Sequence, residues 1–178
     1  MTKKTKKKKK PEYVVEDIGA EVTQGAGNEY PLMPPFASVK ITMEDGKLRY
    51  NLIEPDLGDY KDTLEQVEKL LVKKIEYSVE MVDHPEEYLQ EQMDIVMKEH
   101  REIVPEDIKK DLFYYMRNKF LGLGPLEALL KDPNIEDISC NGPNTPLFIR
   151  HRTMGSLSSN IKFTEEELEP FVMRIGQK

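Results

Sequence analysis

The sequence predicts an α+β domain, because strand-like and helix-like segments fall into separate blocks. Residues 37–43 alternate apolar and polar side chains, which is the period of a half-buried strand. Residues 59–121 instead repeat apolar side chains every three or four positions, the period of helices packed on a core. Strand-like runs return between residues 135 and 163. We therefore expect an N-terminal hairpin, a three-helix subdomain and then a partial sheet-and-helix layer.

Composition divides the chain into three predicted regions. Residues 1–35 combine a lysine run with scattered glycines and prolines and offer little that can be buried, so we expect a disordered basic arm and linker. Residues 36–121 should form the hairpin and the helical subdomain. Residues 122–178 should begin an α/β domain.

The hairpin is predicted from two alternating runs on either side of a turn. Residues 44–47 supply the turn, and residues 47–53 alternate again. Three helices should follow, over residues 59–82, 85–101 and 105–120. We expect Asp59 to cap the first helix and a proline to begin each of the other two.

A sharp change of direction is predicted directly after the third helix. Gly122 and Gly124 supply a turn, and Pro125 stands where the first residue of a short helix is expected. That helix should end at Asp132-Pro133. Its expected apolar face consists of Leu126, Leu129 and Leu130.

The C-terminal part is predicted to contain three strands and a last helix. The strands should cover residues 135–140, 146–151 and 160–163. Thr164 and Glu167 then form the pattern of a capping box, in which each side chain accepts a free backbone N–H of the other residue. The side chains expected to face inward from this helix are Leu168, Phe171, Val172 and Ile175.

The charge of the chain is divided between a short basic arm and an acidic body. The whole chain has a net charge of −7 and the first ten residues hold seven lysines, so residues 11–178 carry −14. An acidic body is a poor general binder of nucleic acid, which needs a basic face on the folded domain. The arm can contact anionic lipid or RNA, or serve only as a solubilising tail. The lysines concerned are Lys3, Lys4, Lys6, Lys7, Lys8, Lys9 and Lys10.

The sequence predicts no catalytic or cofactor-binding residue in this chain. Its only Gly-Lys pair, Gly46-Lys47, lacks the first glycine of a phosphate-binding P-loop. The turn at Gly122 and Gly124 lacks the third glycine of a dinucleotide-binding loop, because Glu127 occupies that position. No apolar run approaches the ~20 residues of a membrane-spanning helix.

A metal centre is not indicated either. Cys140 is the only cysteine, which excludes an internal disulfide and a cysteine-based zinc site, and we expect it to be a small buried residue at a strand end. The three histidines are far apart in the sequence, without acidic partners at metal-binding spacing. They are His84, His100 and His151.

One basic cluster stands out in the acidic body. Arg150, His151 and Arg152 lie together at the junction of a predicted strand and a turn. Such a cluster can contact a phosphate or a neighbouring subunit, or it can simply form a solvated turn.

The turn and the elements after it carry a dense pattern. Residues 122–143 read Gly-x-Gly-Pro-Leu-Glu-x-Leu-Leu-x-Asp-Pro-x-Ile-Glu-Asp-Ile-x-x-Asn-Gly-Pro. This pattern resembles the N-terminal region of the secretion ATPases, the hexameric motors of type II and type IV secretion, type IV pili and the archaeal flagellum. A glycine and an Asn-Ile-x-Phe strand further on also match. The matching residues are Gly122, Gly124, Pro125, Leu126, Glu127, Asp132, Pro133, Ile135, Asp137, Asn141, Gly142, Gly155 and Asn160.

The resemblance implies a docking or regulatory role without catalysis by this chain. In that family the N-terminal portion couples ATP-driven motion within a ring of six to a polytopic platform protein, at the cytoplasmic face of the membrane. ATP and Mg²⁺ would be bound by a RecA-like motor domain, which we expect to follow Lys178. The alternatives are a stand-alone, non-enzymatic adaptor at the membrane surface and an RNA-binding module that uses the lysine arm.

Overall fold

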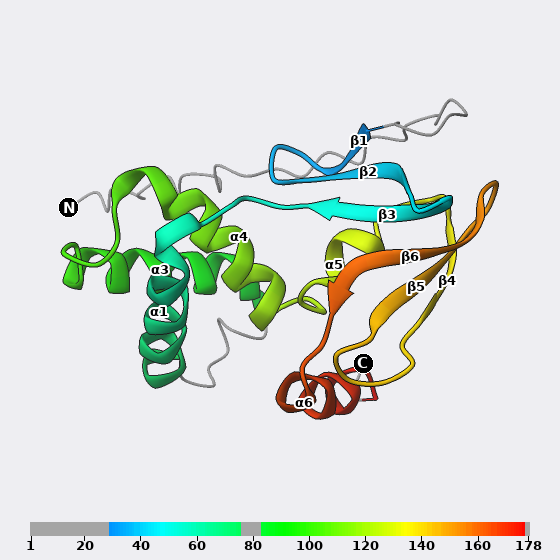
Figure 1. Cartoon of the computed structure of the whole chain (residues 1–178). Helices are drawn as coiled ribbons and strands as arrows, with labels where there is room; N and C mark the ends of the chain where they lie inside the picture. The colour runs from blue at the N-terminus through cyan, green and yellow to red at the C-terminus, as the bar shows by residue number, and fades with distance from the viewer. Residues whose placement is uncertain (1–28, 76–82, 177–178) are drawn as a thin grey trace, which may run out of the picture.

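The computed structural model describes residues 29–75 and 83–176. A group of helices lies beside a curled, six-stranded mixed sheet (Figure 1), which confirms the predicted α+β class. The basic arm at residues 1–28 lies outside the described residues.

Two antiparallel halves make up the sheet, and they come from distant parts of the chain. Its strands follow the order β1-β2-β3-β6-β5-β4, and every neighbouring pair is antiparallel except β3 and β6, which run parallel. The pairing of β3 with β6 therefore joins the N-terminal strands to the C-terminal strands in one sheet. The strands are β1 (Glu29–Met33), β2 (Ala37–Glu44), β3 (Lys47–Ile53), β4 (Ile135–Ser139), β5 (Pro146–His151) and β6 (Gly155–Lys162).

The predicted hairpin is confirmed as β2 and β3. Asp45 and Gly46 form the two central positions of the turn with φ of 51° and 72°, as a tight two-residue hairpin turn requires. Val39 and Ile41 from β2 and Tyr50 from β3 point to the same buried face. The alternation in the sequence therefore marks the face that packs on the core.

The prediction of a disordered segment up to residue 35 is wrong from residue 29 onward. Residues 29–33 form β1, and the side chains of Tyr30 and Met33 are buried. Three prolines within the five residues 31–35 concealed this strand, since proline cannot donate to a ladder. Strand β1 accommodates Pro31 because it lies at the edge of the sheet and has a partner on one side only.

The second long helix begins at Pro85 as predicted, whereas the first and the third begin later. Gly58 has a positive φ of 51° and begins a single 3-10 turn, so the first α-helix starts at Lys61. Asp59 does not cap it, and residues 76–82 of the predicted helix lie outside the described residues. Pro105 has an extended backbone and precedes another 3-10 turn, so the third α-helix starts at Lys109 instead of Pro105. The helices are α1 (Lys61–Lys74), α3 (Pro85–Glu99), α4 (Lys109–Phe120), α5 (Leu126–Leu129) and α6 (Glu165–Ile175), with 3-10 turns η1 (Gly58–Tyr60) and η2 (Glu106–Ile108).

Two hydrophobic cores follow from this arrangement. The helical core joins α1, α3 and α4, and includes Leu71, Met93 and Met116. The sheet core lies between the sheet and α5 and combines hairpin residues such as Ile41 with C-terminal residues such as Ile149. The apolar side chains of the hairpin thus pack mainly with those of residues 122–178 and with Tyr114 of α4, in a core separate from the helical core. The predicted domain boundary at residue 121 stays a prediction.

Three expectations about the C-terminal elements need correction. Leu130 is 56% exposed, and Ala128 takes its place among the buried residues of α5. Strand β6 begins at Gly155 instead of residue 160. The prediction missed its first part because the serine-rich run there has a weak strand preference. In α6, Leu168 and Phe171 pack on the sheet core as expected, whereas Val172 and Ile175 are exposed. Apolar spacing shows which side chains share a helix face, not whether that face is covered.

Candidate functional site

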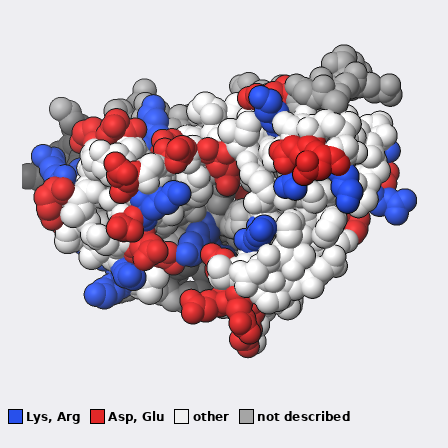
Figure 2. Space-filling model, in the orientation of Figure 1, with Lys and Arg blue, Asp and Glu red and all other residues white. Residues whose placement is uncertain are grey.

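A groove of about 370 Å³ lies where the helices meet the C-terminal part of the sheet. Helix α4 forms one side, the turn before α5 forms the end, and α6 forms the other side. Figure 2 shows the hollow between the two halves of the molecule, with lysine and arginine side chains beside it. The lining side chains used below are Glu54, Tyr115, Asn118, Lys119, Lys162, Phe163, Phe171 and Arg174.

The turn at the end of the groove is built by the residues that carry the family resemblance. Gly124 has a φ of 58° and donates its N–H to the carbonyl oxygen of Asn118 at 2.8 Å. The Glu127 carboxylate folds back and accepts the N–H of Leu123 at 3.0 Å. A β-carbon on Gly122 would lie 2.6 Å from Oε2 of Glu127 and 2.9 Å from the backbone oxygen of Asn118. These residues therefore fix the direction in which the chain leaves α4.

The walls of the groove are largely aromatic. Phe163 and Phe171 stack with ring centroids 4.5 Å apart, joining the end of β6 to α6. Across from them, the Tyr115 hydroxyl donates to the carbonyl oxygen of Pro55 at 2.7 Å. The opposite faces of the groove are thus tied to the same sheet.

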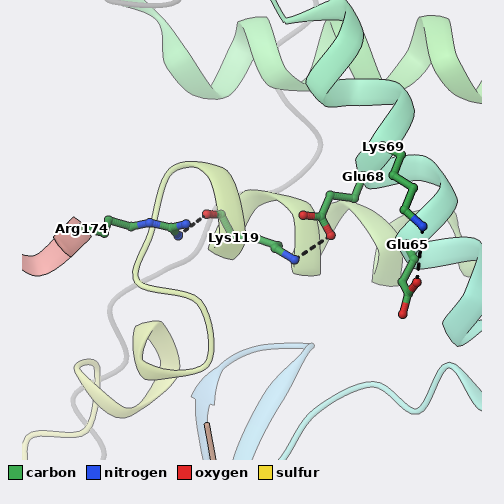
Figure 3. A network of polar contacts seen from close by, with 5 residues as sticks. All are labelled: Glu65, Glu68, Lys69, Lys119 and Arg174. Carbon is green, nitrogen blue, oxygen red and sulfur yellow. Dashed lines mark hydrogen bonds and ion pairs between the residues drawn. The ribbon is translucent and has the colours of Figure 1, made fainter. Parts of the chain in front are cut away.

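The charged groups of the groove are unevenly paired. The Lys119 ammonium lies 2.6 Å from a Glu68 carboxylate oxygen on α1, and an Arg174 guanidinium nitrogen donates to the Lys119 carbonyl oxygen at 2.6 Å (Figure 3). Within the described residues, the Lys162 ammonium has no hydrogen bond or ion pair, and the buried Asn118 side-chain nitrogen has no hydrogen-bond acceptor. No described groove residue forms a nucleophile–base pair.

Glu54 is a half-buried carboxyl group in the lining of the groove. It accepts a hydrogen bond from the Tyr114 hydroxyl at 2.7 Å, and burial raises the pKa of Glu54 although this hydrogen bond opposes the shift. The same burial, with the nearby Glu54 charge, raises the pKa of Tyr114. The folded protein therefore holds the Glu54 proton more tightly than the unfolded chain does.

Replacing Glu54 by glutamine should stabilise the protein more at neutral pH than at acid pH. A raised carboxyl pKa contributes stability that is present below the unfolded value of 4.5 and is lost as pH rises through the folded value. Glutamine keeps the acceptor for Tyr114 and removes the cost of the buried charge. Urea unfolding at about pH 4 and about pH 7 should show the E54Q advantage only at the higher pH. E169Q, on the exposed face of α6, controls for the loss of one charge, and an equal effect of both variants would contradict the prediction.

A second polar cluster lies inside the sheet core. The Asp132 carboxylate is 4% exposed and accepts hydrogen bonds from the hydroxyls of Tyr30 and Tyr50, both at 2.7 Å. Its other oxygen accepts the backbone N–H of Asn134 at 2.8 Å and the Asn134 side-chain amide at 3.0 Å. Burial, followed by the Asp132 interactions, raises the pKa of both tyrosines. The carboxylate connects β1 and β3 to the turn before β4, which is a structural role for a residue of the resemblance.

The structure does not bring the three residues of the basic cluster together. Arg150 is exposed, with its nearest guanidinium nitrogen 3.5 Å from Glu136. His151 points to the other face of β5 and is 2% exposed; its Nδ1 accepts the N–H groups of Thr153 and Met154, and burial lowers its pKa. Phosphate or subunit contact at this turn stays a prediction for Arg150 and Arg152 alone.

Asn160 forms the link between the two halves of the sheet. Its side-chain oxygen accepts the N–H of Leu52 at 2.9 Å, and its side-chain nitrogen donates to the Leu52 carbonyl oxygen at 2.8 Å. The backbone pairing of β3 with β6 covers only Arg49 and Tyr50. At Leu52, two residues further along β3, the Asn160 amide takes the place of a paired strand.

Replacing Asn160 by alanine should therefore lower the free energy of unfolding by about 1–3 kcal/mol, because two backbone groups of Leu52 lose their partners. The exposed neighbour Lys162 provides a matched control, since K162A removes a side chain of β6 without a hydrogen bond. Thermal unfolding of both variants measures the difference. Equal stability of N160A and the parent chain would show that the amide does not hold the halves together.

The remaining residues of the resemblance are structural or exposed. Asp137 accepts a hydrogen bond from the Ser139 hydroxyl at 2.9 Å, and Gly142 and Gly155 supply turns with φ of 128° and 76°. Pro133, Ile135 and Asn141 lie in the same segment. Cys140 is exposed, contrary to expectation, because it follows an edge strand and has no covering element.

Neither a metal-binding cluster nor a membrane-spanning helix is found in the described ranges, 29–75 and 83–176. No three or more His, Cys, Asp or Glu side chains gather there in a way that could hold a metal ion. In the same ranges, no helix combines the length and the hydrophobicity needed to cross a membrane.

Comparison with known proteins finds archaeal relatives. The chain is 32% identical over 134 residues to the uncharacterized protein MJ1288 of Methanocaldococcus jannaschii. The aligned stretch covers 73% of this chain and 53% of that protein. The chain is 35% identical over 77 residues to MJ0900 of the same organism, also uncharacterized, which covers 43% of this chain and 14% of that protein. No family model matches. The chain spans about half the length of the first relative and a small part of the second.

Proposed function

We propose that this chain is the N-terminal docking and regulatory portion of an archaeal-type secretion, pilus or archaellum ATPase. The observation that carries the proposal is the position of the resembling residues. They form the Gly122–Pro125 turn that joins the helical core to the sheet core, and the Asp132 cluster directly after it. A part that transmits motion needs a junction of fixed geometry, and each of these residues has a specific contact there.

The relatives support this proposal in two ways. Both matched proteins are archaeal, in agreement with the archaeal type of the resemblance. The 77 residues shared with MJ0900 make up only 14% of that protein, so a similar segment occurs as a small part of a much longer chain. A module that works beside other domains is expected to show this pattern.

In the proposed mechanism, a motor domain binds ATP and Mg²⁺, and this chain passes on the resulting motion. Helix α4 contributes Tyr114 to the sheet core and Met116 to the helical core, so a force on the sheet moves the helices with it. The helical subdomain would contact the polytopic platform protein at the inner face of the membrane. The lysine arm would add attraction to anionic lipid, at about 1 kcal/mol per lysine near the surface.

The test is to isolate the native protein from its own cells with an antibody raised against this chain. We expect an intact mass well above 20.7 kDa, or a 20.7 kDa chain in a stable complex with a P-loop ATPase. We also expect ATP hydrolysis by the isolated material and a native mass that fits six copies. A free 20.7 kDa chain without associated ATPase activity would reject the motor proposal and favour the membrane-surface adaptor.

A further inference from the structure

Helix α6 is held to the rest of the molecule by few contacts. None of its eleven residues is buried. Leu168 and Phe171 contact the sheet core, and Phe171 stacks on Phe163, all within the first two turns. In the last turn the side chains of Val172 and Met173 are 59% and 64% exposed. The two ends of the helix therefore differ in how firmly they are attached.

The N-terminal end of α6 is fixed. It follows β6 directly, and Thr164 and Glu167 close a complete capping box, with the N–H of each residue bonded to the side chain of the other. Pro170 then interrupts the helix interior, because it has no N–H to donate to the preceding turn. The helix can therefore bend near Pro170 at little cost.

The C-terminal end is held by Arg174. Its guanidinium donates to the carbonyl oxygen of Lys119 at 2.6 Å, across the groove (Figure 3). That carbonyl lies in the last turn of α4, where helix carbonyls lack an intrahelical N–H partner and carry the negative end of the dipole. The Lys119 side chain extends to Glu68 of α1. One hydrogen bond thus connects α6 to the helical core.

We propose that α6 is a hinged lid over the groove and that the Arg174–Lys119 hydrogen bond is its latch. Release of the latch lets the last turn of α6 swing away from α4 about the region of Pro170, while Leu168 and Phe171 keep the first two turns on the sheet core. The groove between α4 and α6, with its aromatic walls and its unpaired Lys162, then widens. This inference concerns the chain itself and does not depend on a motor domain or on nucleotide.

Hydrogen exchange of the full chain, followed by mass spectrometry, tests the lid. Replacing Arg174 by methionine keeps most of the side-chain length and removes the donor. We expect exchange of the amides in residues 171–176 to become about tenfold faster or more, the effect of losing one hydrogen bond to a charged donor. Exchange in β2 and β3 should be unchanged.

Two controls separate the latch from other effects. Arg152→Met removes an exposed arginine whose side chain has no partner among the described residues, and should leave α6 unchanged. Lys119→Met removes the ion pair with Glu68 but keeps the backbone carbonyl that accepts from Arg174, so α6 should keep its protection.

Three results would overturn the proposal. The first is unchanged exchange of α6 in R174M. The second is equally faster exchange in β2, β3 and α6, which would indicate loss of global stability. The third is α6 exchange in the parent chain as fast as in an unstructured peptide, which would mean that no closed state exists.

Discussion

Replacing Asp132 by alanine is expected to lower the free energy of unfolding by about 3 kcal/mol or more, since each buried polar group left without a partner costs about 1–3 kcal/mol. The variant leaves the hydroxyls of Tyr30 and Tyr50 and the N–H of Asn134 without their acceptor. It also leaves a void in the sheet core. The measurement is urea-induced unfolding, with the free energy extrapolated to water.

Two further variants test whether the carboxylate acts as described. Tyr50→Phe removes one donor and leaves the others, so it should cost about 1 kcal/mol. Asp137→Ala removes a neighbouring carboxylate that is exposed and, among the described residues, bonds only to Ser139, so it should change stability by less than about 0.5 kcal/mol. A D132A variant as stable as D137A would show that the tyrosines find other partners and that the cluster does not hold β1 in the sheet.

Replacing Gly122 by alanine is expected to cost about 1–3 kcal/mol, the usual range for overpacking a closely packed site. The added methyl group would meet Oε2 of Glu127 at 2.6 Å and the backbone oxygen of Asn118 at 2.9 Å. The carboxylate can move, but only by giving up its hydrogen bond to the N–H of Leu123. The backbone oxygen belongs to α4 and already accepts from Gly124.

The matched control is Gly176→Ala, because a β-carbon there has no neighbour closer than 3.6 Å and the φ of −67° suits alanine. It should be neutral or slightly stabilising. In the double variant G122A/E127A, the loss should be smaller than the sum of the single losses, since one of the two clashes has gone. Thermal unfolding of the parent chain, G122A, E127A, G122A/E127A and G176A measures these differences. If the stability loss of G122A/E127A equals the sum of the two single losses, Glu127 does not determine the need for glycine at position 122.

Elements with a strong period could be predicted from the sequence alone. The hairpin, α3 and the capping box of α6 occur where apolar spacing, a proline and capping residues indicated them. Helix α4 follows the predicted apolar spacing but begins at Lys109, four residues after the proline expected to open it. Strand β1 was missed because its burial depends on pairing with β2 and on the hydroxyl of Tyr30 reaching Asp132, about a hundred residues away. No local pattern contains that information.

The groove could not have been predicted for a related reason. Glu54, Asn118 and Arg174 meet only because β6 pairs with β3 and carries α6 back beside α4. The sequence marked Gly122, Asp132 and Asn160 through the resemblance but not their contacts. In the basic cluster, residues that are neighbours in the sequence are separated in the structure. Successive side chains of a strand point to opposite faces, so His151 is turned inward and Arg150 is not.

The parallel pairing of β3 with β6 also has a consequence for synthesis on the ribosome. Strand β3 ends at Ile53, and its partner begins only at Gly155, so about a hundred residues must emerge before the sheet can close. Until then β3 presents an open edge, which is the kind of surface through which nascent chains associate wrongly. Polar side chains on β3 reduce this hazard. Any truncation before residue 155 should expose that edge permanently and yield insoluble protein.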